Sequence, residues 1–185
     1  MLTIPNLISL LRLGLIPVFL WLLFGKDNPF AAGWLLGVIG STDWIDGYLA
    51  RRLNQVSEVG KFLDPLADRL AVAAAVIGGI ITGDLPALFA WPLIIREAVV
   101  GVGAIVVALK GHTKLAVRDM GKLATFLLYF SVAWFFVGAE WSWATALGWI
   151  AGVPGLILYY VVAVQYAGDA AAAIRARQAS DQPAG

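Results

Sequence analysis

The sequence predicts an all-α, polytopic membrane protein with six transmembrane helices and a short N-terminal interfacial helix. Of its 185 residues, 61% are hydrophobic and 14% are charged, compared with about half and about a quarter in soluble domains. Apolar runs close to the roughly 20 residues that cross a bilayer core of about 30 Å alternate with short polar segments. The chain has no cysteine and a net charge of +1, which excludes disulfide and thiolate chemistry and a strongly basic nucleic-acid binder.

The predicted elements follow one another without an internal repeat. Residues 1–12 are expected to form the interfacial helix, either separate from the first span or continuous with it, with Pro5 in its first turn and the side chain of Arg12 reaching the headgroups. The predicted spans cover residues 13–24, 30–51, 56–81, 87–109, 123–137 and 144–166. We expect residues 1–168 to form one membrane domain and residues 169–185 to form a cytoplasmic tail that is disordered at its end.

Basic residues are distributed unequally between the two ends of these spans. One side carries Arg51, Arg52, Lys61, Lys110, Lys114, Arg118, Lys122, Arg175 and Arg177. The other side carries Lys26 alone, together with Asp27, Asp84 and Glu140. Because Lys and Arg accumulate in cytoplasmic connections, we expect both termini and the more basic side to face the cytoplasm.

Four aspartates lie in two pairs, one near the end of the second predicted span and one near the start of the third. Asp43 and Asp46 are spaced i,i+3, and Asp64 and Asp68 are spaced i,i+4, so on helices each pair shares one face. Carboxylates in such apolar surroundings are costly unless they are paired, protonated or bound to metal. Oxygen-rich sites of this kind suit Mg²⁺ or Mn²⁺, and two such ions suit phosphoryl chemistry. The spacing favours a metal-dependent phosphoryl site, and leaves open an ion or proton pathway and a structural polar cluster.

The wider motif resembles the signature of a known enzyme family. The fixed positions are Asp43, Asp46, Gly47, Ala50, Arg51, Gly60, Asp64 and Asp68. This pattern is similar to that of the CDP-alcohol phosphotransferases, also called CDP-alcohol phosphatidyltransferases. The opening residues Pro5, Asn6, Ser9 and Arg12 resemble the start of bacterial phosphatidylglycerophosphate synthases and related cardiolipin synthases.

The resemblance implies transfer of a phosphatidyl group from CDP-diacylglycerol to an alcohol, with release of CMP. It implies that Asp43, Asp46 and Asp64 hold two divalent ions, Mg²⁺ or Mn²⁺. It further implies that Asp68 removes the proton of the acceptor hydroxyl and can also contact a metal. The positions expected to bind CDP-diacylglycerol are Asp43, Gly47, Ala50, Arg51, Ser57 and Gly60. A bacterial plasma membrane and a homodimer are also implied.

The acceptor is less clearly indicated. Arg96 and Glu97 fall inside the fourth predicted span. They either pair with each other or with the aspartate helices, or contribute to an acceptor site. The segment 110–122 either attracts anionic lipid headgroups or forms a pocket for an anionic acceptor, in which Lys114, Arg118 and Lys122 take part with Arg96.

The segment 121–125 resembles the GKxKT motif, followed by Gln, of phosphatidylglycerophosphate synthases. Ala124 replaces its second Lys and Leu128 replaces the Gln. We slightly favour glycerol 3-phosphate as acceptor, with phosphatidylglycerol, and thus a cardiolipin synthase, as the alternative and inositol phosphates as a smaller possibility. From another class, a divalent-cation transporter could use the same carboxylates, but it should carry ionisable residues along a path through the membrane.

Overall fold

The computed structural model describes residues 4–53, 58–109 and 119–180, with side chains described at residues 7–42, 67, 69–99, 120–165, 167 and 168. Over the described residues the chain is helical. Its elements are α1 (Ile4–Leu20), η1 (Trp21–Gly25), α2 (Pro29–Leu53), α3 (Glu58–Thr82), α4 (Ala87–Leu109), α5 (Asp119–Val137) and α6 (Ser142–Ser180). The all-helical prediction is confirmed.

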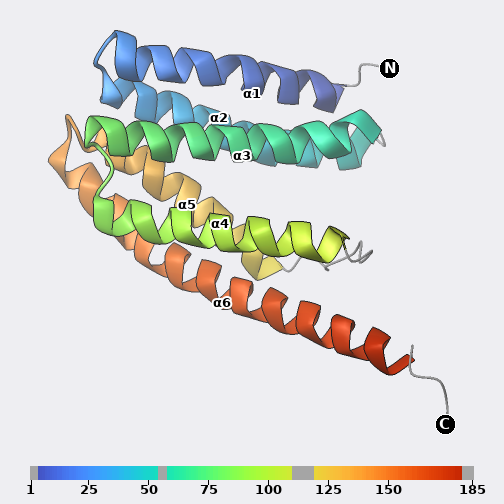
Figure 1. The fold of residues 1–185 in the computed structure, drawn as a ribbon. Helices are drawn as coiled ribbons and strands as arrows, with labels where there is room; N and C mark the ends of the chain where they lie inside the picture. Colours follow the sequence, from blue (N-terminus) through green and yellow to red (C-terminus); the bar gives the residue numbers. More distant parts are fainter. Residues whose placement is uncertain (1–3, 54–57, 110–118, 181–185) are drawn as a thin grey trace.

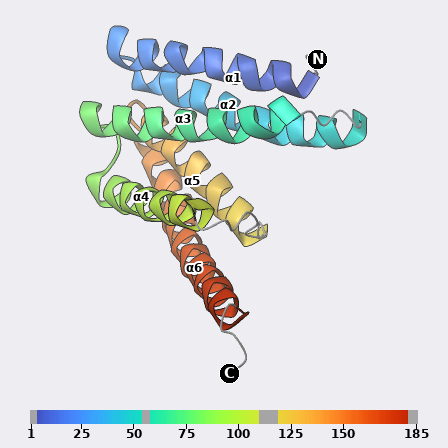
Figure 2. The same ribbon diagram turned by 45° about the vertical axis from the view of Figure 1, so that its right-hand side comes forward.

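The helices form a bundle in which the chain runs back and forth (Figure 1). We call the end where α2 stops and α3 begins the aspartate end, and the end where η1, α3 and α5 stop the opposite end. The helices α1, α3 and α5 run away from the aspartate end, and α2, α4 and α6 run back to it. Figure 2 shows that α1, α2 and α3 lie together on one side of the bundle, while α4 and α6 lie on the other side.

The turns at the opposite end follow from local sequence. After the π-helical η1, the backbone N–H of Lys26 donates to the carbonyl of Trp21 at 3.0 Å, and Asp27 adopts a positive φ of 49°. Asn28 then caps α2, because its Oδ1 accepts from the backbone N–H of Ala31 at 2.9 Å. Gly83 ends α3 with a φ of 83°, a left-handed conformation that glycine adopts without strain.

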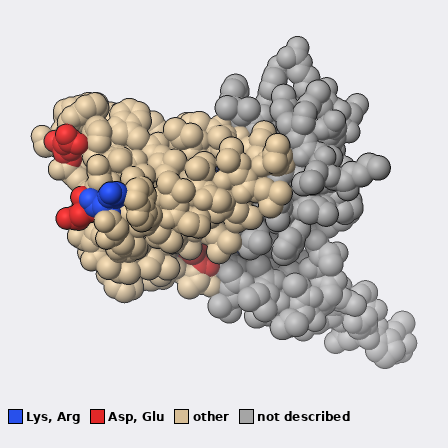
Figure 3. Space-filling view, turned by 90° about the horizontal axis from the view of Figure 1, so that it is seen from above, with Lys and Arg blue, Asp and Glu red and all other residues tan. Residues whose placement is uncertain are grey.

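Length and composition agree with an integral membrane protein. Among the described residues, three segments are long and apolar enough to cross a bilayer: Leu7–Gly25, Met120–Val137 and Ser142–Gln165. Two shorter apolar segments are Pro29–Thr42 and Arg69–Thr82. In Figure 3, the described part of the visible face shows Lys, Arg, Asp and Glu gathered mainly at one end, while most of its length is uncharged, as a lipid-covered surface requires.

Two details differ from the sequence-based expectations. Residues 4–25 form one continuous helical segment, which is one of the two expected arrangements, but Arg12 within it is only 1% exposed. Arg12 therefore lies inside the bundle. The expectation that its side chain extends along the surface to the headgroups is wrong. The second detail is α6, whose 39 residues continue beyond the predicted end near residue 166. At about 1.5 Å per residue α6 is roughly 58 Å long, well beyond a bilayer core of about 30 Å.

The core is apolar and closely packed by small residues. Phe19 of α1 meets Phe136 of α5 edge to face, with ring centroids 5.5 Å apart. At Gly33 of α2, an added Cβ would lie 2.8 Å from the carbonyl oxygen of Ala133. The α2 and α5 backbones therefore approach each other closely, which fixes how α2 enters the aspartate end.

Candidate functional site

The four aspartates lie on two helices that both pack against α1 and α5. Asp43 and Asp46 belong to the last three turns of α2, and Asp64 and Asp68 to the first three turns of α3. Their side chains lie outside the described set, so their placement rests on the helices that carry them. Both predicted pairs are helical, which confirms the backbone basis for each pair sharing one helix face.

Contacts farther along α3 and α5 fix the level of Asp68 in the bundle. These helices run in the same direction, and a Cβ added at Gly79 would lie 3.0 Å from Cζ of Phe136. Asp68 precedes Gly79 by eleven residues, and Thr125 precedes Phe136 by eleven residues. Because both helices rise by about 1.5 Å per residue, Asp68 and Thr125 lie at about the same level.

The contact between α2 and α5 gives the level of Asp43. These helices are antiparallel, and a Cβ added at Gly40 would lie 2.7 Å from Cδ1 of Tyr129. Asp43 lies three residues after Gly40, and Phe126 lies three residues before Tyr129. Asp43 is therefore about level with Phe126, one residue from Thr125. The two aspartate pairs come to one level of the bundle, although they are separate in sequence.

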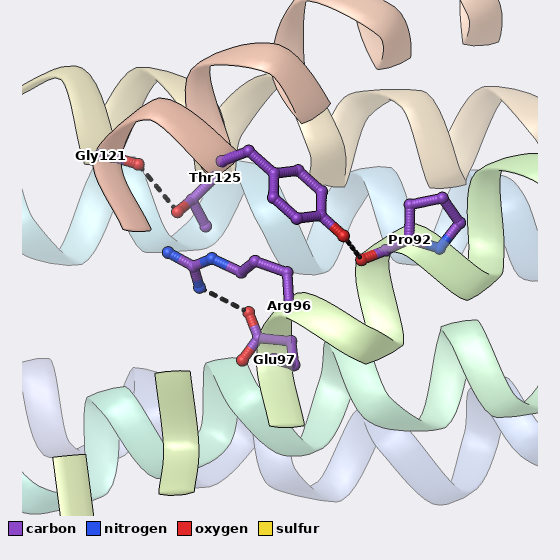
Figure 4. A network of polar contacts seen from close by, with 6 residues as sticks. Pro92, Arg96, Glu97, Gly121 and Thr125 are labelled. Atoms are coloured by element: carbon purple, nitrogen blue, oxygen red, sulfur yellow. Dashed lines mark hydrogen bonds and ion pairs between the residues drawn. The ribbon is translucent and has the colours of Figure 1, made fainter. Parts of the chain in front are cut away.

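Arg96 of α4 is the charged side chain whose surroundings are best defined. It is 7% exposed, and its Nη1 donates to Oε1 of Glu97 at 3.1 Å (Figure 4). Its guanidinium carbon lies 3.3 Å from the centre of the Tyr159 ring, which is a cation–π stacking arrangement. The prediction that Arg96 and Glu97 pair is confirmed, and α6 supplies the aromatic surface under the cation.

Arg96 lies at about the same level as the aspartates. Tyr159 lies four residues after Gly155, at which an added Cβ would lie 3.1 Å from Cβ of Leu127 on the antiparallel α5. Counting four residues back from Leu127 reaches residue 123, which is adjacent to Ala124. In Figure 4 the guanidinium is drawn between Glu97 and the α5 residue Thr125. The level that holds both aspartate pairs therefore also holds the buried guanidinium of Arg96.

The interior side of α5 near this level is apolar. Ala124 is 0% exposed and Leu128 is 5% exposed, and both belong to the hydrophobic core. These are the positions where the resembling synthases carry Lys and Gln. Lys122, by contrast, is exposed. The described part of α5 thus places no cation in the interior at this level.

The remaining predicted contacts are only partly located. Gly47, Ala50 and Arg51 lie on α2 after the first aspartate pair, and Gly60 lies on α3 before the second pair. Their side-chain surroundings are outside the described set. Ser57, Lys114 and Arg118 lie outside the described residues, as does most of the predicted basic connection.

Two tyrosines near Arg96 were not identified from the sequence. Tyr159 stacks on the guanidinium, and the hydroxyl of Tyr160 donates to the carbonyl of Pro92 at 2.6 Å (Figure 4). They lie more than sixty residues from Arg96 in the chain, and a tyrosine in an apolar span looks like an ordinary interfacial aromatic. Phe89 of α4 contacts Gly152 of α6. Arg96 and Tyr159 each follow these residues by seven positions, so a sequence search could look for an arginine and a tyrosine at this equal spacing.

Comparison with known proteins identifies the family to which the chain is similar. A family model described as CDP-alcohol phosphatidyltransferase matches residues 2–163. The chain is 36% identical over 189 aligned positions to the cardiolipin synthase (CMP-forming) of Streptomyces coelicolor, covering 97% of this chain and 88% of that protein. It is 34% identical to a putative cardiolipin synthase of Mycobacterium tuberculosis, covering 90% of this chain and 81% of that protein. It is also 38% identical to the CDP-diacylglycerol--glycerol-3-phosphate 3-phosphatidyltransferase of Bacillus subtilis, covering 72% of this chain and 76% of that protein.

The fold and the aspartate motif define a helical membrane enzyme that transfers substituted phosphate groups. The match over most of the chain shows that it belongs to the CDP-alcohol phosphatidyltransferase family. The predicted family is therefore confirmed, and so is the prediction of an enzyme of phospholipid synthesis in the membrane.

Proposed function

We propose that this enzyme transfers the phosphatidyl group of CDP-diacylglycerol to phosphatidylglycerol, forming cardiolipin and CMP. In this reaction the bond between the phosphatidyl phosphorus and the CMP oxygen breaks. A bond forms from the acceptor hydroxyl oxygen to the same phosphorus, and the hydroxyl proton is removed. The observation that carries the proposal is the buried Arg96, which is already paired with Glu97 beside an apolar α5.

The aspartates fit a pair of divalent ions. Four aspartate positions at about one level lie on helices that pack against α1 and α5, and aspartates supply the hard oxygen ligands that Mg²⁺ and Mn²⁺ prefer. We assign Asp43, Asp46 and Asp64 to holding the ions. When bound, such ions neutralise the diphosphate and stabilise the charge on the leaving CMP. We assign Asp68 the role of the general base that accepts the proton of the acceptor hydroxyl.

Gly47, Ala50, Arg51, Ser57 and Gly60 are proposed to bind the cytidine nucleotide. The small residues leave room for the nucleotide next to the helix backbones, and a guanidinium can bind phosphate through two parallel hydrogen bonds. The diacylglycerol chains stay in the bilayer, so the reaction takes place near the membrane surface. We propose that this surface is cytoplasmic, because the more basic connections lie at the aspartate end.

Charge distinguishes the two glycerol acceptors. Glycerol 3-phosphate carries a phosphomonoester of nearly two negative charges near neutral pH, whereas phosphatidylglycerol carries a phosphodiester of one. The Glu97 carboxylate already offsets much of the positive charge of the Arg96 guanidinium. The pair therefore stabilises a dianion less than an unpaired guanidinium would. The apolar Ala124 and Leu128 supply no further cation. The interior therefore suits a singly charged lipid acceptor better.

Glycerol 3-phosphate remains the second candidate. The observation in its favour is the 38% identity to the Bacillus subtilis enzyme, whose name specifies that acceptor. If Lys114, Arg118 and Lys122 approached Arg96 when substrate binds, they would add the cations that a phosphomonoester needs. A direct assay separates the two acceptors.

The test uses purified enzyme in detergent with CDP-diacylglycerol and Mg²⁺, and measures CMP release and the lipid product. We expect cardiolipin with phosphatidylglycerol, no CMP release above background with glycerol 3-phosphate, and loss of both with EDTA. Restoration of CMP release by added Mg²⁺ or Mn²⁺, together with loss of CMP release in Asp64→Asn, would support the metal assignment. CMP release with glycerol 3-phosphate alone would overturn the choice of acceptor, and metal flux into sealed vesicles without CMP release would overturn the enzyme assignment.

We also propose a homodimer in which α4 takes part. Its outward stripe of large apolar side chains is exposed in the single chain: Leu88, Trp91, Ile95 and Val99. Because the chain has no cysteine, Trp91→Cys gives a single thiol on this stripe for cross-linking in membranes. Ile150→Cys, on an exposed position of α6, is the matched control. Equal cross-linking of both variants would contradict an interface at α4.

A further inference from the structure

Arg12 lies in the bundle interior although it belongs to an apolar helix. It is 1% exposed, and Ser9, nearly one turn earlier, is completely buried. Phe19 and Leu23 continue this buried stripe at helical spacing. A guanidinium in an apolar membrane-embedded interior is costly unless anionic or other acceptor groups surround it.

The contact between Leu23 and Gly78 sets the offset between α1 and α3. A Cβ added at Gly78 would lie 2.7 Å from Cδ2 of Leu23, and the two helices run side by side in the same direction (Figure 1). Arg12 precedes Leu23 by eleven residues, and Ala67 precedes Gly78 by eleven residues. These steps are about 16 Å along each helix. Arg12 is therefore level with Ala67, which is completely buried.

This level on α3 is the level of the second aspartate pair. Asp64 lies three residues before Ala67, and Asp68 follows it directly. On an ideal helix with about 100° between residues, position 64 falls about 40° and position 68 about 80° from the position of Gly78. Both positions therefore belong to the side of α3 that meets α1, and Asp64 is the more central of the two.

None of the acidic groups among the described side chains lies at this level on a helix that packs against α1. Glu97 is on α4 and accepts from Arg96. Asp27, Asp84 and Glu140 follow η1, α3 and α5 at the opposite end. The acidic positions that share the level of the buried Arg12 and also lie on helices packed against α1, namely α2 and α3, are thus those of the aspartate site.

We propose that Arg12 is a positioning residue for the aspartate site and holds the Asp64 carboxylate through a buried ion pair. This inference rests on the proposed function, in which Asp64 is a ligand of a divalent ion. The planar guanidinium fixes the direction of a carboxylate through parallel N–H groups. It also offsets part of the negative charge of four clustered carboxylates while the ions and CDP-diacylglycerol are absent.

A double-mutant cycle on thermal stability tests the pairing without using activity. The melting temperature of the purified protein in detergent with EDTA is measured for Arg12→Met, Asp64→Asn and the double variant. Coupled residues give non-additive effects, and distant ones give additive effects. We expect Arg12→Met to lower the melting temperature of the native sequence clearly, and to lower it by less than half as much in the Asp64→Asn background.

Asp84→Asn is the matched control background, because Asp84 lies after the far end of α3 and accepts from the hydroxyl of Thr82 at 2.6 Å. There, Arg12→Met should cause its full shift. Equal shifts in all three backgrounds would overturn the proposal. If Arg12→Met does not fold, the same cycle is run with Arg12→Lys, which keeps the charge and loses the planar geometry, and the same two patterns decide. Failure of the CMP-release assay would refute the proposed function and leave this cycle unaffected.

Discussion

The close contact at Gly33 predicts a large effect from the addition of one methyl group. In Gly33→Ala the new Cβ would lie 2.8 Å from the carbonyl oxygen of Ala133 and from Cβ of Phe136, and 2.9 Å from the backbone nitrogen of Val137. None of these atoms belongs to a side-chain end that can rotate away. Because ordinary contacts need about 3.5–4.0 Å, α2 and α5 must separate by roughly 1 Å.

The expected cost of this overpacking is about 1–3 kcal/mol, or roughly 5- to 150-fold in the unfolding equilibrium. Gly37→Ala, one turn later on the same helix, is the matched control because a Cβ there meets nothing within 4 Å. Both variants gain the same helix preference of alanine over glycine, up to about 1 kcal/mol. The difference between the two variants therefore isolates the packing term.

Unfolding in mixed micelles with increasing denaturing detergent measures this difference, followed by far-UV circular dichroism. We expect Gly37→Ala to be as stable as the native protein or more stable, and Gly33→Ala to be clearly less stable than Gly37→Ala. Because α2 continues from Gly33 to Asp43 and Asp46, activity of Gly33→Ala should also decline faster on warming. Equal stability of the two variants would refute the close α2–α5 contact.

Three further predictions concern single side chains. Ser131→Ala removes the buried hydrogen bond from its hydroxyl to the Gly148 carbonyl, 2.6 Å long, and should lower the free energy of unfolding by about 0.5–1.5 kcal/mol without changing KM. Tyr159→Leu removes the stacking under Arg96, worth about 0.5–2 kcal/mol, and should raise KM for phosphatidylglycerol while Tyr159→Phe does not; equal KM values would contradict this. Asp68→Asn should abolish CMP release and keep the native circular dichroism spectrum, and near-normal turnover would remove Asp68 from the role of base.

The sequence was sufficient to predict the helical membrane fold and the aspartate motif. Long apolar runs require internally satisfied backbone groups, which makes helices the expected structure. The pairs at Asp43 and Asp64 are spaced within single helices, so local periodicity alone indicates a shared face. Arg96 and Glu97 are neighbours in the chain, and their pairing was correctly expected for the same local reason.

Features that depend on contacts between distant segments were missed. The burial of Arg12 follows from packing of α1 against α3, and an arginine near the start of an apolar run looks like a headgroup contact from sequence alone. The stacking of Tyr159 under Arg96 joins α6 to α4, and no local periodicity predicts it. The length of α6 was underestimated because a membrane span sets an expected length, whereas an Ala-rich segment favours continued helix beyond it.

The central claim is that this family member uses a singly charged lipid acceptor at a site where the buried Arg96 is already paired with Glu97. The most direct measurement is a side-by-side incubation of purified enzyme with CDP-diacylglycerol, Mg²⁺ and either labelled phosphatidylglycerol or labelled glycerol 3-phosphate. We predict that the label from phosphatidylglycerol appears in cardiolipin and that the label from glycerol 3-phosphate stays in the water-soluble fraction. Labelled phosphatidylglycerophosphate, with no labelled cardiolipin, would contradict the account.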